Sequence, residues 1–142
     1  MNFDIDSLAT AAQKTYDVVV GHLPGAEGAD PTPVGFTVVG PDSDQFRAAE
    51  RATAVFGIQE AERRKAPLDL SKPEDAGRMY DGLEGSKAIL LDHCVVGWFG
   101  FMQGDQAAAF TPENLRKVLR AKPHWARRLV GEIENAANFD GA

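Results

Sequence analysis

The strongest constraint on the fold lies in residues 94–139, where the sequence marks the start of one helix and the break before another. Thr111 is a favourable N-cap, because its hydroxyl can accept a hydrogen bond from a backbone N–H that the first turn leaves unpaired. Pro112 follows at the first helical position, where its missing N–H costs nothing. Pro123 interrupts the pattern, since proline pushes the residue before it away from helical angles. The sequence therefore predicts one short helix after Thr111 and a second from about residue 123 to residue 138.

Each of these two predicted helices has an apolar face. Apolar residues recur at intervals of three and four, which is the spacing of one side of a helix. On the first helix they are Leu115, Val118 and Leu119, and on the second they are Trp125, Leu129, Ile133 and Ala136. Two short helices joined by a tight bend form a helical corner. We expect the rest of the chain to pack on this corner.

A β-hairpin is predicted near the N-terminus. Two segments are rich in β-branched side chains, as strands are, namely residues 15–23 (TYDVVVGHL) and 34–39 (VGFTVV). In the second segment Val34, Phe36 and Val38 share one face. Glycines and prolines between the two segments predict a mobile loop at the hairpin tip.

Two more helices are predicted between the hairpin and the corner. Capping-box spacings mark both starts, Asp42 with Gln45 and Ser71 with Glu74. The first helix is expected to end near residue 65, and the second to run from Pro73 into the middle nineties. Apolar residues form a stripe along the second helix: Met79, Leu83, Leu90 and Cys94, widened by Tyr80, Ile89 and Leu91.

Together these elements predict a single domain, residues 1–142, that is mainly α-helical with an N-terminal β-hairpin (α+β). It comprises an N-terminal arm (1–14), the hairpin with its mobile tip (15–40), and a helical body (41–139) of about four helices. A length of 142 residues is ordinary for one domain and allows one hydrophobic core.

The charge of the chain argues against nucleic acid and membranes as partners. The formal net charge is −6 and the pI is about 5.0, so the chain has no general attraction for phosphate. The longest apolar stretch, residues 88–102, is too short and too polar to span a membrane. A basic run from Arg116 to Arg128 is the exception, and three interpretations of it stay open. In the first, its residues are the solvated faces of two helices; in the second, they contact DNA phosphates; in the third, they bind an acidic segment of another protein.

Residues that carry catalysis or bind metal ions are sparse. One cysteine, Cys94, allows no intrachain disulfide and indicates a reducing compartment. His93 precedes it, but neighbours on a helix point about 100° apart and do not face each other. No two histidines have the spacing of a helical zinc site, and GLEGSK (82–87) lacks the residue order of a phosphate loop. We therefore expect no enzyme activity and no catalytic, cofactor-binding or metal-binding residues.

Aromatic residues are concentrated just before the predicted corner. Trp98, Phe99 and Phe101 are too close in sequence to share one face of one element. Part of this run is therefore expected to be exposed, or to be buried only in an assembly. The residues predicted to bind a partner are Trp98, Phe99, Phe101, Phe110, Leu115, Leu119 and Trp125.

The sequence resembles tail assembly chaperones of long-tailed (siphophage-type) bacteriophages. Those sequences contain a Val-rich segment, a Trp, a polar turn, Phe-Ser/Thr-x-Glu-Asn, a Leu-rich helix, a proline and a closing helix that ends near Asn-Phe. The matching positions are Val96, Trp98, Phe110, Thr111, Glu113, Asn114, Leu115, Leu119, Pro123 and Phe139. Upstream, residues 38–52 (VVGPDSDQFRAAERA) are similar to the family's strand, Pro-Asp-Ser and following helix. The turn MQGDQAAA after Trp98 is less acidic than is usual in the family.

This resemblance implies a binding protein and no enzyme. It implies that the chain binds the tape measure protein, a very long helix-rich chain that sets tail length, keeps it soluble and helps recruit the tail tube protein around it. It also implies a homo-oligomer in the host cell cytoplasm that is absent from the mature virion. The helix from Pro73 and the aromatic cluster are expected to form a groove for partner helices. Two alternatives stay open: a small helix-turn-helix DNA-binding regulator that uses residues 111–138, and a structural head–tail connector or stopper component.

Overall fold

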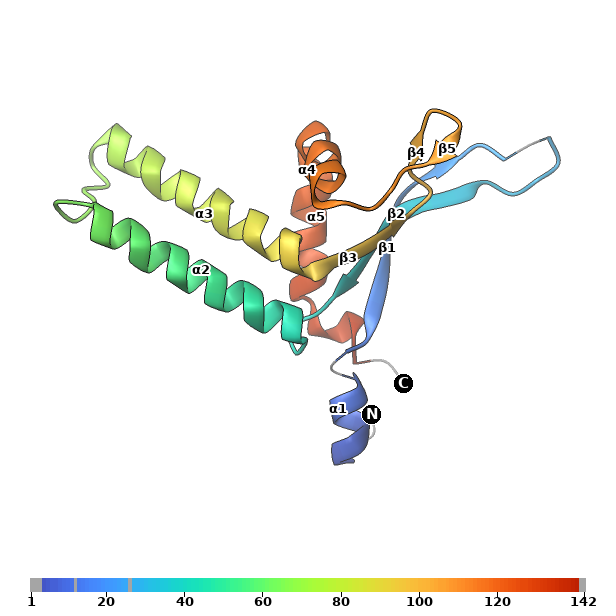
Figure 1. Cartoon of the computed structure of the whole chain (residues 1–142), viewed down its shortest axis with the longest axis horizontal. Helices are drawn as coiled ribbons and strands as arrows, with labels where there is room; N and C mark the ends of the chain where they lie inside the picture. Colours follow the sequence, from blue (N-terminus) through green and yellow to red (C-terminus); the bar gives the residue numbers. More distant parts are fainter. Residues whose placement is uncertain (1–3, 12, 26, 141–142) are drawn as a thin grey trace.

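A helical arm and an antiparallel sheet project from opposite sides of a small helical corner (Figure 1). This computed structural model describes residues 4–11, 13–25 and 27–140.

The larger sheet combines the N-terminal hairpin with one strand from much later in the chain. Its strands are β1 (Thr15–Leu23), β2 (Thr32–Val39) and β3 (Val95–Phe99), in that order and antiparallel. The predicted hairpin strands are confirmed, and β2 begins a little before the predicted residue 34. The three residues predicted to share a face, Val34, Phe36 and Val38, are all buried.

The predicted fold class, mainly α-helical with an N-terminal hairpin, is wrong, because strands also form outside the hairpin. Within the described residues the fold is mixed α+β, with five α-helices and five strands in two antiparallel sheets. The second sheet pairs β4 (Met102–Gln103) with β5 (Gln106–Ala107). Valine and aromatic side chains favour a strand at residues 95–99, whereas Gly97 and Gly100 indicate a helix exit when the sequence is considered alone. In the structure only Gly100 ends the strand, with φ of 83°.

The arm consists of α2 (Asp44–Arg63), α3 (Pro73–Cys94) and the connection between them. The two helices lie side by side and extend away from the sheet (Figure 1). Phe56 of α2 lies across Gly85 of α3, where an added Cβ would be 3.8 Å from the phenyl ring. Because α3 ends at Cys94 and β3 begins at the next residue, the arm is attached directly to the sheet.

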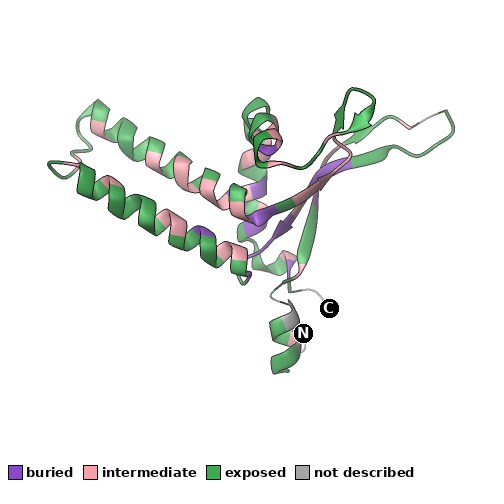
Figure 2. Cartoon of the chain, in the orientation of Figure 1, coloured by how far each residue is buried: buried purple, intermediate pink, exposed green. Residues whose placement is uncertain are grey.

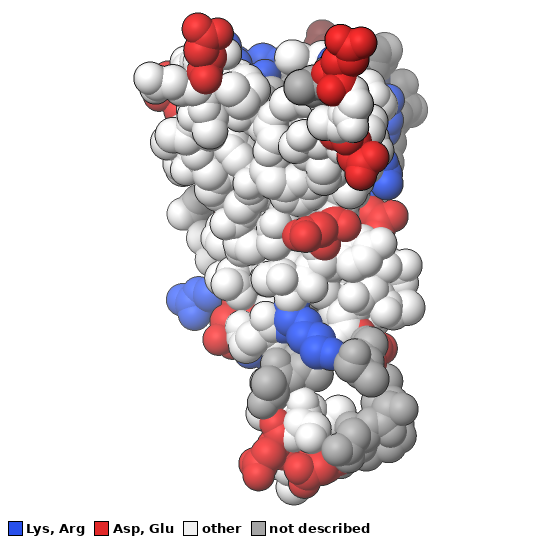
Figure 3. Space-filling model, turned by 90° about the vertical axis from the view of Figure 1, so that its right-hand side faces the viewer, with Lys and Arg blue, Asp and Glu red and all other residues white. Residues whose placement is uncertain are grey.

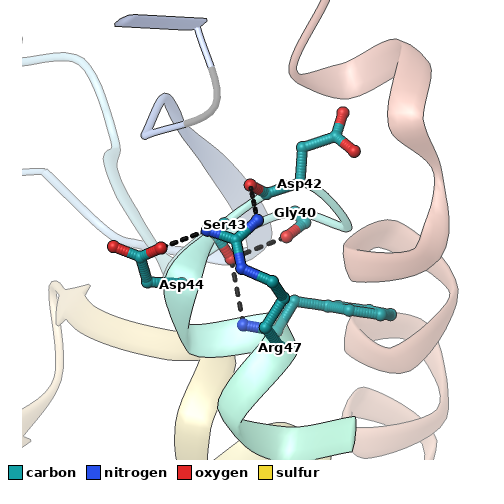
Figure 4. Close-up of polar contacts among 6 residues, drawn as sticks. Gly40, Asp42, Ser43, Asp44 and Arg47 are labelled. Atoms are coloured by element: carbon teal, nitrogen blue, oxygen red, sulfur yellow. Dashed lines mark hydrogen bonds and ion pairs between the residues drawn. The ribbon is translucent and has the colours of Figure 1, made fainter. Parts of the chain in front are cut away.

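The start of α2 differs from the predicted capping box. Ser43, and not Asp42, is the N-cap: its Oγ accepts a hydrogen bond from the N–H of Phe46 at 3.1 Å (Figure 4). The same hydroxyl donates a hydrogen bond of 2.7 Å to the carbonyl oxygen of Gly40. Ser43 is fully buried, so these two bonds satisfy a hydroxyl that water does not reach.

The other two predicted helix starts have opposite outcomes. The N-cap of α4 (Pro112–Ala121) is confirmed, because Thr111 Oγ1 accepts a hydrogen bond of 3.1 Å from the N–H of Asn114. The capping box predicted before α3 is wrong. The hydroxyl of Ser71 donates instead to the carboxylate of Asp69 at 2.6 Å, and α3 starts without a side-chain cap.

The predicted helical corner is present as α4 and α5 (Pro123–Glu134). The second helix of the corner ends before the predicted residue 138, and a short 3₁₀ turn, η1 (Ala136–Asn138), follows it. Phe139 then lies over Gly40, where any Cβ would overlap its phenyl ring. The last turn of the described chain is therefore held against the junction between β2 and α2.

Buried residues gather where the sheet, the end of α3 and α5 meet (Figure 2). The core contains Val18, Phe36, Val38, Val39, Leu91, Cys94, Val95, Leu115, Leu129, Ile133 and Phe139. These residues come from the sheet, the base of the arm and the corner, together with Phe139, which follows η1. The outer part of the arm contributes little to the core, and most of its surface is exposed (Figure 2).

At the N-terminus, α1 (Ile5–Ala11) lies apart from the helical arm that α2 and α3 form (Figure 1). The predicted N-terminal arm includes residues 1–3 and 12, and the predicted mobile tip includes residue 26; these lie outside the described residues. Across the part of the chain that is described, none of the helices combines the length and the apolar character needed to span a bilayer.

Candidate partner-binding surfaces

Four of the seven predicted partner-binding residues form the ring cluster with Phe36 of β2. Three of them, Trp98, Phe101 and Trp125, contact Phe36 directly, and Phe110 joins the cluster through Trp98. The ring centres of Trp98 and Phe101 are 4.7 Å apart, and Phe110 meets Trp98 edge-on at 5.5 Å. The indole Nε1 of Trp98 donates a hydrogen bond of 3.0 Å to the carbonyl oxygen of Ala108. The cluster is therefore a packed unit, with Phe110 exposed at its edge.

The remaining three predicted residues lie elsewhere. Leu115 is only 2% exposed and belongs to the core, and Leu119 is half-buried against that core. Phe99 is on the opposite face of β3 from Trp98, because successive strand residues point to opposite sides. Its ring covers Gly35 on the neighbouring strand. The assignment of these residues to partner binding stays a prediction, and the exposed fractions favour Phe110 over Leu115.

The arm exposes larger fractions of its apolar side chains than the ring cluster does. On α3, Tyr80 is 63% exposed and Leu83 is 57% exposed, while on α2 Ile58 is 64% exposed. The prediction named α3 as one wall of a groove but assigned none of these residues. The signal that indicates Tyr80 and Leu83 is the apolar stripe on α3, because it extends beyond the part of the helix that packs against the core.

The end of the molecule formed by the hairpin is a second open surface. Figure 3 views this end and shows that most side chains across its middle carry no charge. Val19 and Leu23 of β1 and Met102 of β4 are exposed apolar residues of the strands. The strand β1 is also an edge of the sheet, because it pairs only with β2 among the described strands.

Two residues of the basic run from Arg116 to Arg128 contact other parts of the molecule. Arg116 donates a hydrogen bond of 3.2 Å to the carboxylate of Asp92 on α3. Arg128 donates one of 2.8 Å to the backbone carbonyl of Val19 on β1. These two guanidinium groups thus attach the corner to the arm and to the sheet, which favours a structural role for them over phosphate contact.

His93 and Cys94 do not form a nucleophile and base pair in this geometry. The Nδ1 of His93 lies 2.9 Å from the carbonyl oxygen of Ile89, one turn earlier on α3. Cys94 is fully buried, and this burial raises the pKa of its thiol to about 11. Within residues 4–11, 13–25 and 27–140, no group of three or more His, Cys, Asp or Glu side chains is placed to hold a metal ion.

We predict that Cys94 does not react with a thiol reagent at pH 8 while the protein is folded. The thiolate is the reactive form, and with a pKa of about 11 only about one thiol in a thousand is ionised at that pH. A colorimetric disulfide reagent should detect the thiol only after denaturation. A Leu83→Cys variant is the control, because its added thiol lies on exposed surface and should react at once. Rapid labelling of the folded wild-type chain would contradict the burial.

Comparison of the chain with known protein families, curated proteins and solved structures finds no match.

Proposed function

We propose that this protein is a tail assembly chaperone of a long-tailed bacteriophage, which binds the tape measure protein, keeps it soluble and helps recruit tail tube subunits around it. The observation that carries the proposal is the open apolar surface of α3 on the arm, where Tyr80 and Leu83 are neighbours on one face of the helix and are each more than half exposed. Contiguous apolar surface on a soluble protein usually marks a site of protein–protein interaction. A helix-rich partner suits this surface, because amphipathic helices bind through regularly spaced apolar side chains.

The residues that carry the family resemblance support the proposal by their location. Phe139 lies over Gly40, which precedes the Pro-Asp-Ser segment, and Ser43 of that segment caps α2. Thr111 caps α4, and Leu115 of α4 lies in the core. Residues that match the family pattern, from two distant parts of the sequence, thus form the junction from which the arm projects. A scaffold that presents the arm to a partner is consistent with this arrangement.

A very long partner also suits a small protein with a modest binding surface. Each arm offers only a few apolar side chains, so a single contact is expected to be weak. A tape measure protein of many helical segments could bind many copies, and contacts between copies would raise the overall affinity through effective concentration. Self-association of the chain is therefore part of the proposal.

Co-expression tests the proposal directly. We expect the tape measure protein of the same phage genome to move from the insoluble to the soluble fraction when this protein is co-expressed, and to be retained with it on an affinity column. An unrelated helix-rich protein of similar length serves as the control and should be neither solubilised nor retained. Absence of retention at micromolar concentrations of both proteins would contradict the proposal.

Two further measurements separate the alternatives. A structural connector or stopper component would be detected in purified phage particles by immunoblotting, whereas an assembly chaperone would be absent from them. A DNA-binding regulator would give a gel shift that weakens steeply with salt, because phosphate contacts release counterions. Arg127→Glu should abolish such a shift, since Arg127 lies on the exposed surface of α5.

A further inference from the structure

Six residues of α3 are spaced alternately by four and three positions, which is the spacing of a coiled-coil seam. We call this set the α3 seam: Ala76, Tyr80, Leu83, Lys87, Leu90 and Cys94. A helix advances about 100° per residue, so residues with this spacing stay on one side of it over several turns. Five of the six are apolar or small, and Lys87 is the exception.

A helix of the same chain already covers one end of the α3 seam. Cys94 is fully buried and Leu90 packs against the core, together with Leu129 and Ile133 of α5. Direct contacts join α3 and α5, and Figure 1 shows α5 next to the end of α3 that leads into the sheet. This end of the seam is therefore an established helix-packing surface.

The other end of the same seam has no such cover. Tyr80 is 63% exposed and Leu83 is 57% exposed, and Ala76 beyond them is exposed as well. Lys87 lies where the covered part of the seam meets the open part, and its ammonium group pairs with Glu84 of the same helix at 3.1 Å. Residues 73–87 span roughly 22 Å of helix, which is enough for about four turns of a second helix.

The charge of α3 favours one kind of occupant. Residues 73–87, along which the open end of the seam lies, carry four carboxylates and two basic side chains, a net charge of −2. Both basic side chains pair with carboxylates of α3 itself, Arg78 with Asp75 at 3.8 Å and Lys87 with Glu84. Complementary charge steers association and disfavours wrong partners. A helix with Lys or Arg beside its apolar stripe is thus preferred over one with Asp or Glu there.

We propose that the open end of the α3 seam binds an amphipathic helix of the partner protein whose apolar stripe is flanked by basic residues. This inference rests on the proposed function, since the partner helix would belong to the tape measure protein. The bound helix continues the surface that α5 covers at the other end of the seam. Tyr80 and Leu83 are the central contacts.

Synthetic helices test the chemistry of the site on the full-length protein. Two labelled peptides of about three heptads, roughly 21 residues, share leucines at the seam positions and differ only in their flanking residues, Lys in one and Glu in the other. Fluorescence anisotropy should show the basic peptide binding at least about tenfold more tightly at low salt, with the preference reduced at high salt. Equal affinities, or tighter binding of the acidic peptide, would overturn the charge preference.

A matched pair of variants tests the location of the site. Leu83→Glu places a charge in the seam, whereas Ile58→Glu places one at a similarly exposed position on α2. Leu83→Glu should weaken binding of the basic peptide on the order of tenfold or more, as loss of a central contact does. Ile58→Glu should bind like the wild type, and circular dichroism should show that both variants remain folded. Equal effects of the two variants would remove the α3 seam as the site.

Retention of the tape measure protein distinguishes failure of this inference from failure of the proposed function. If the wild type does not retain it, the proposed function fails. If the wild type and Leu83→Glu retain it equally, only the seam assignment fails. A second copy of this chain is the other occupant to test. Sedimentation that shows a wild-type dimer, dissociated by Leu83→Glu and unaffected by the basic peptide, would replace the proposed helix with a second copy.

Discussion

Replacing Gly35 by alanine is expected to cause the largest loss of stability of any glycine-to-alanine substitution in the three-stranded sheet. A Cβ at this position would overlap the backbone carbonyl oxygen of Val18 on β1 and lie 2.8 Å from Cζ of Phe99 on β3. The backbone cannot move aside without breaking the pairing of β1 with β2. We expect the free energy of unfolding to fall by more than about 3 kcal/mol, beyond the usual cost of overpacking a core. Urea denaturation followed by circular dichroism measures this loss.

Gly21 provides the matched control for this substitution. It also lies in the sheet, but no atom comes within 4 Å of a Cβ added there. Gly21→Ala should therefore change the free energy of unfolding by no more than about 1 kcal/mol. If Gly35→Ala and Gly21→Ala had the same denaturation midpoint, the close approach of the three strands at Gly35 would be contradicted.

Phe36→Ala is expected to cost about 3–5 kcal/mol, because it removes a fully buried ring and leaves a cavity at the centre of the core. The ring centre of Phe36 lies 5.1 Å from that of Phe101, 6.3 Å from Trp125 and 6.4 Å from Trp98. Both tryptophans should therefore report the change, through a shifted fluorescence maximum and a weaker near-ultraviolet circular dichroism signal. Chemical denaturation measures the loss of stability.

Phe56→Ala tests whether the arm is packed less tightly than the core. Phe56 is the same residue type, but it lies on the arm and is 37% exposed. Its removal exposes less apolar surface and creates no closed cavity, so the cost should be less than half of that at Phe36. Tryptophan fluorescence should stay unchanged. Comparable losses at the two positions would mean that the arm is packed as tightly as the core.

Local features of the sequence were sufficient to predict several elements. Thr111 and Pro112 predict the start of α4, because the capping hydroxyl and the fixed proline angle act within a single turn. The β-branched residues of 15–23 predict β1 for the same kind of reason. Ser43 was missed as a cap because Asp42 beside it satisfies the same sequence pattern, and the choice between them depends on the carbonyl of Gly40.

The candidate site was predicted less completely than the fold. The sequence predicts the apolar stripe on α3, but the stripe does not reveal which of its turns the rest of the chain covers. Aromatic side chains near Trp98 were assigned to a partner because they are crowded in sequence. In the structure, Phe36 of β2 instead packs between Trp98 of β3 and Trp125 of α5, so that these rings form one cluster. Exposure on the arm depends on how much of α3 the core covers, which is a property of the whole fold.

The sequence by itself determined the elements whose signals are short-range: the hairpin strands, the proline-marked helix starts and the apolar stripe of α3. The tertiary structure alone decided that residues 95–99 join β2 as a third strand, since a strand needs a neighbouring edge that lies more than fifty residues away in the chain. It also decided that the stripe of α3 divides into a covered end at Cys94 and an open end at Leu83. A side chain is buried only where other parts of the chain pack against it. Those contacts exist only after the arm, the sheet and the corner have packed together.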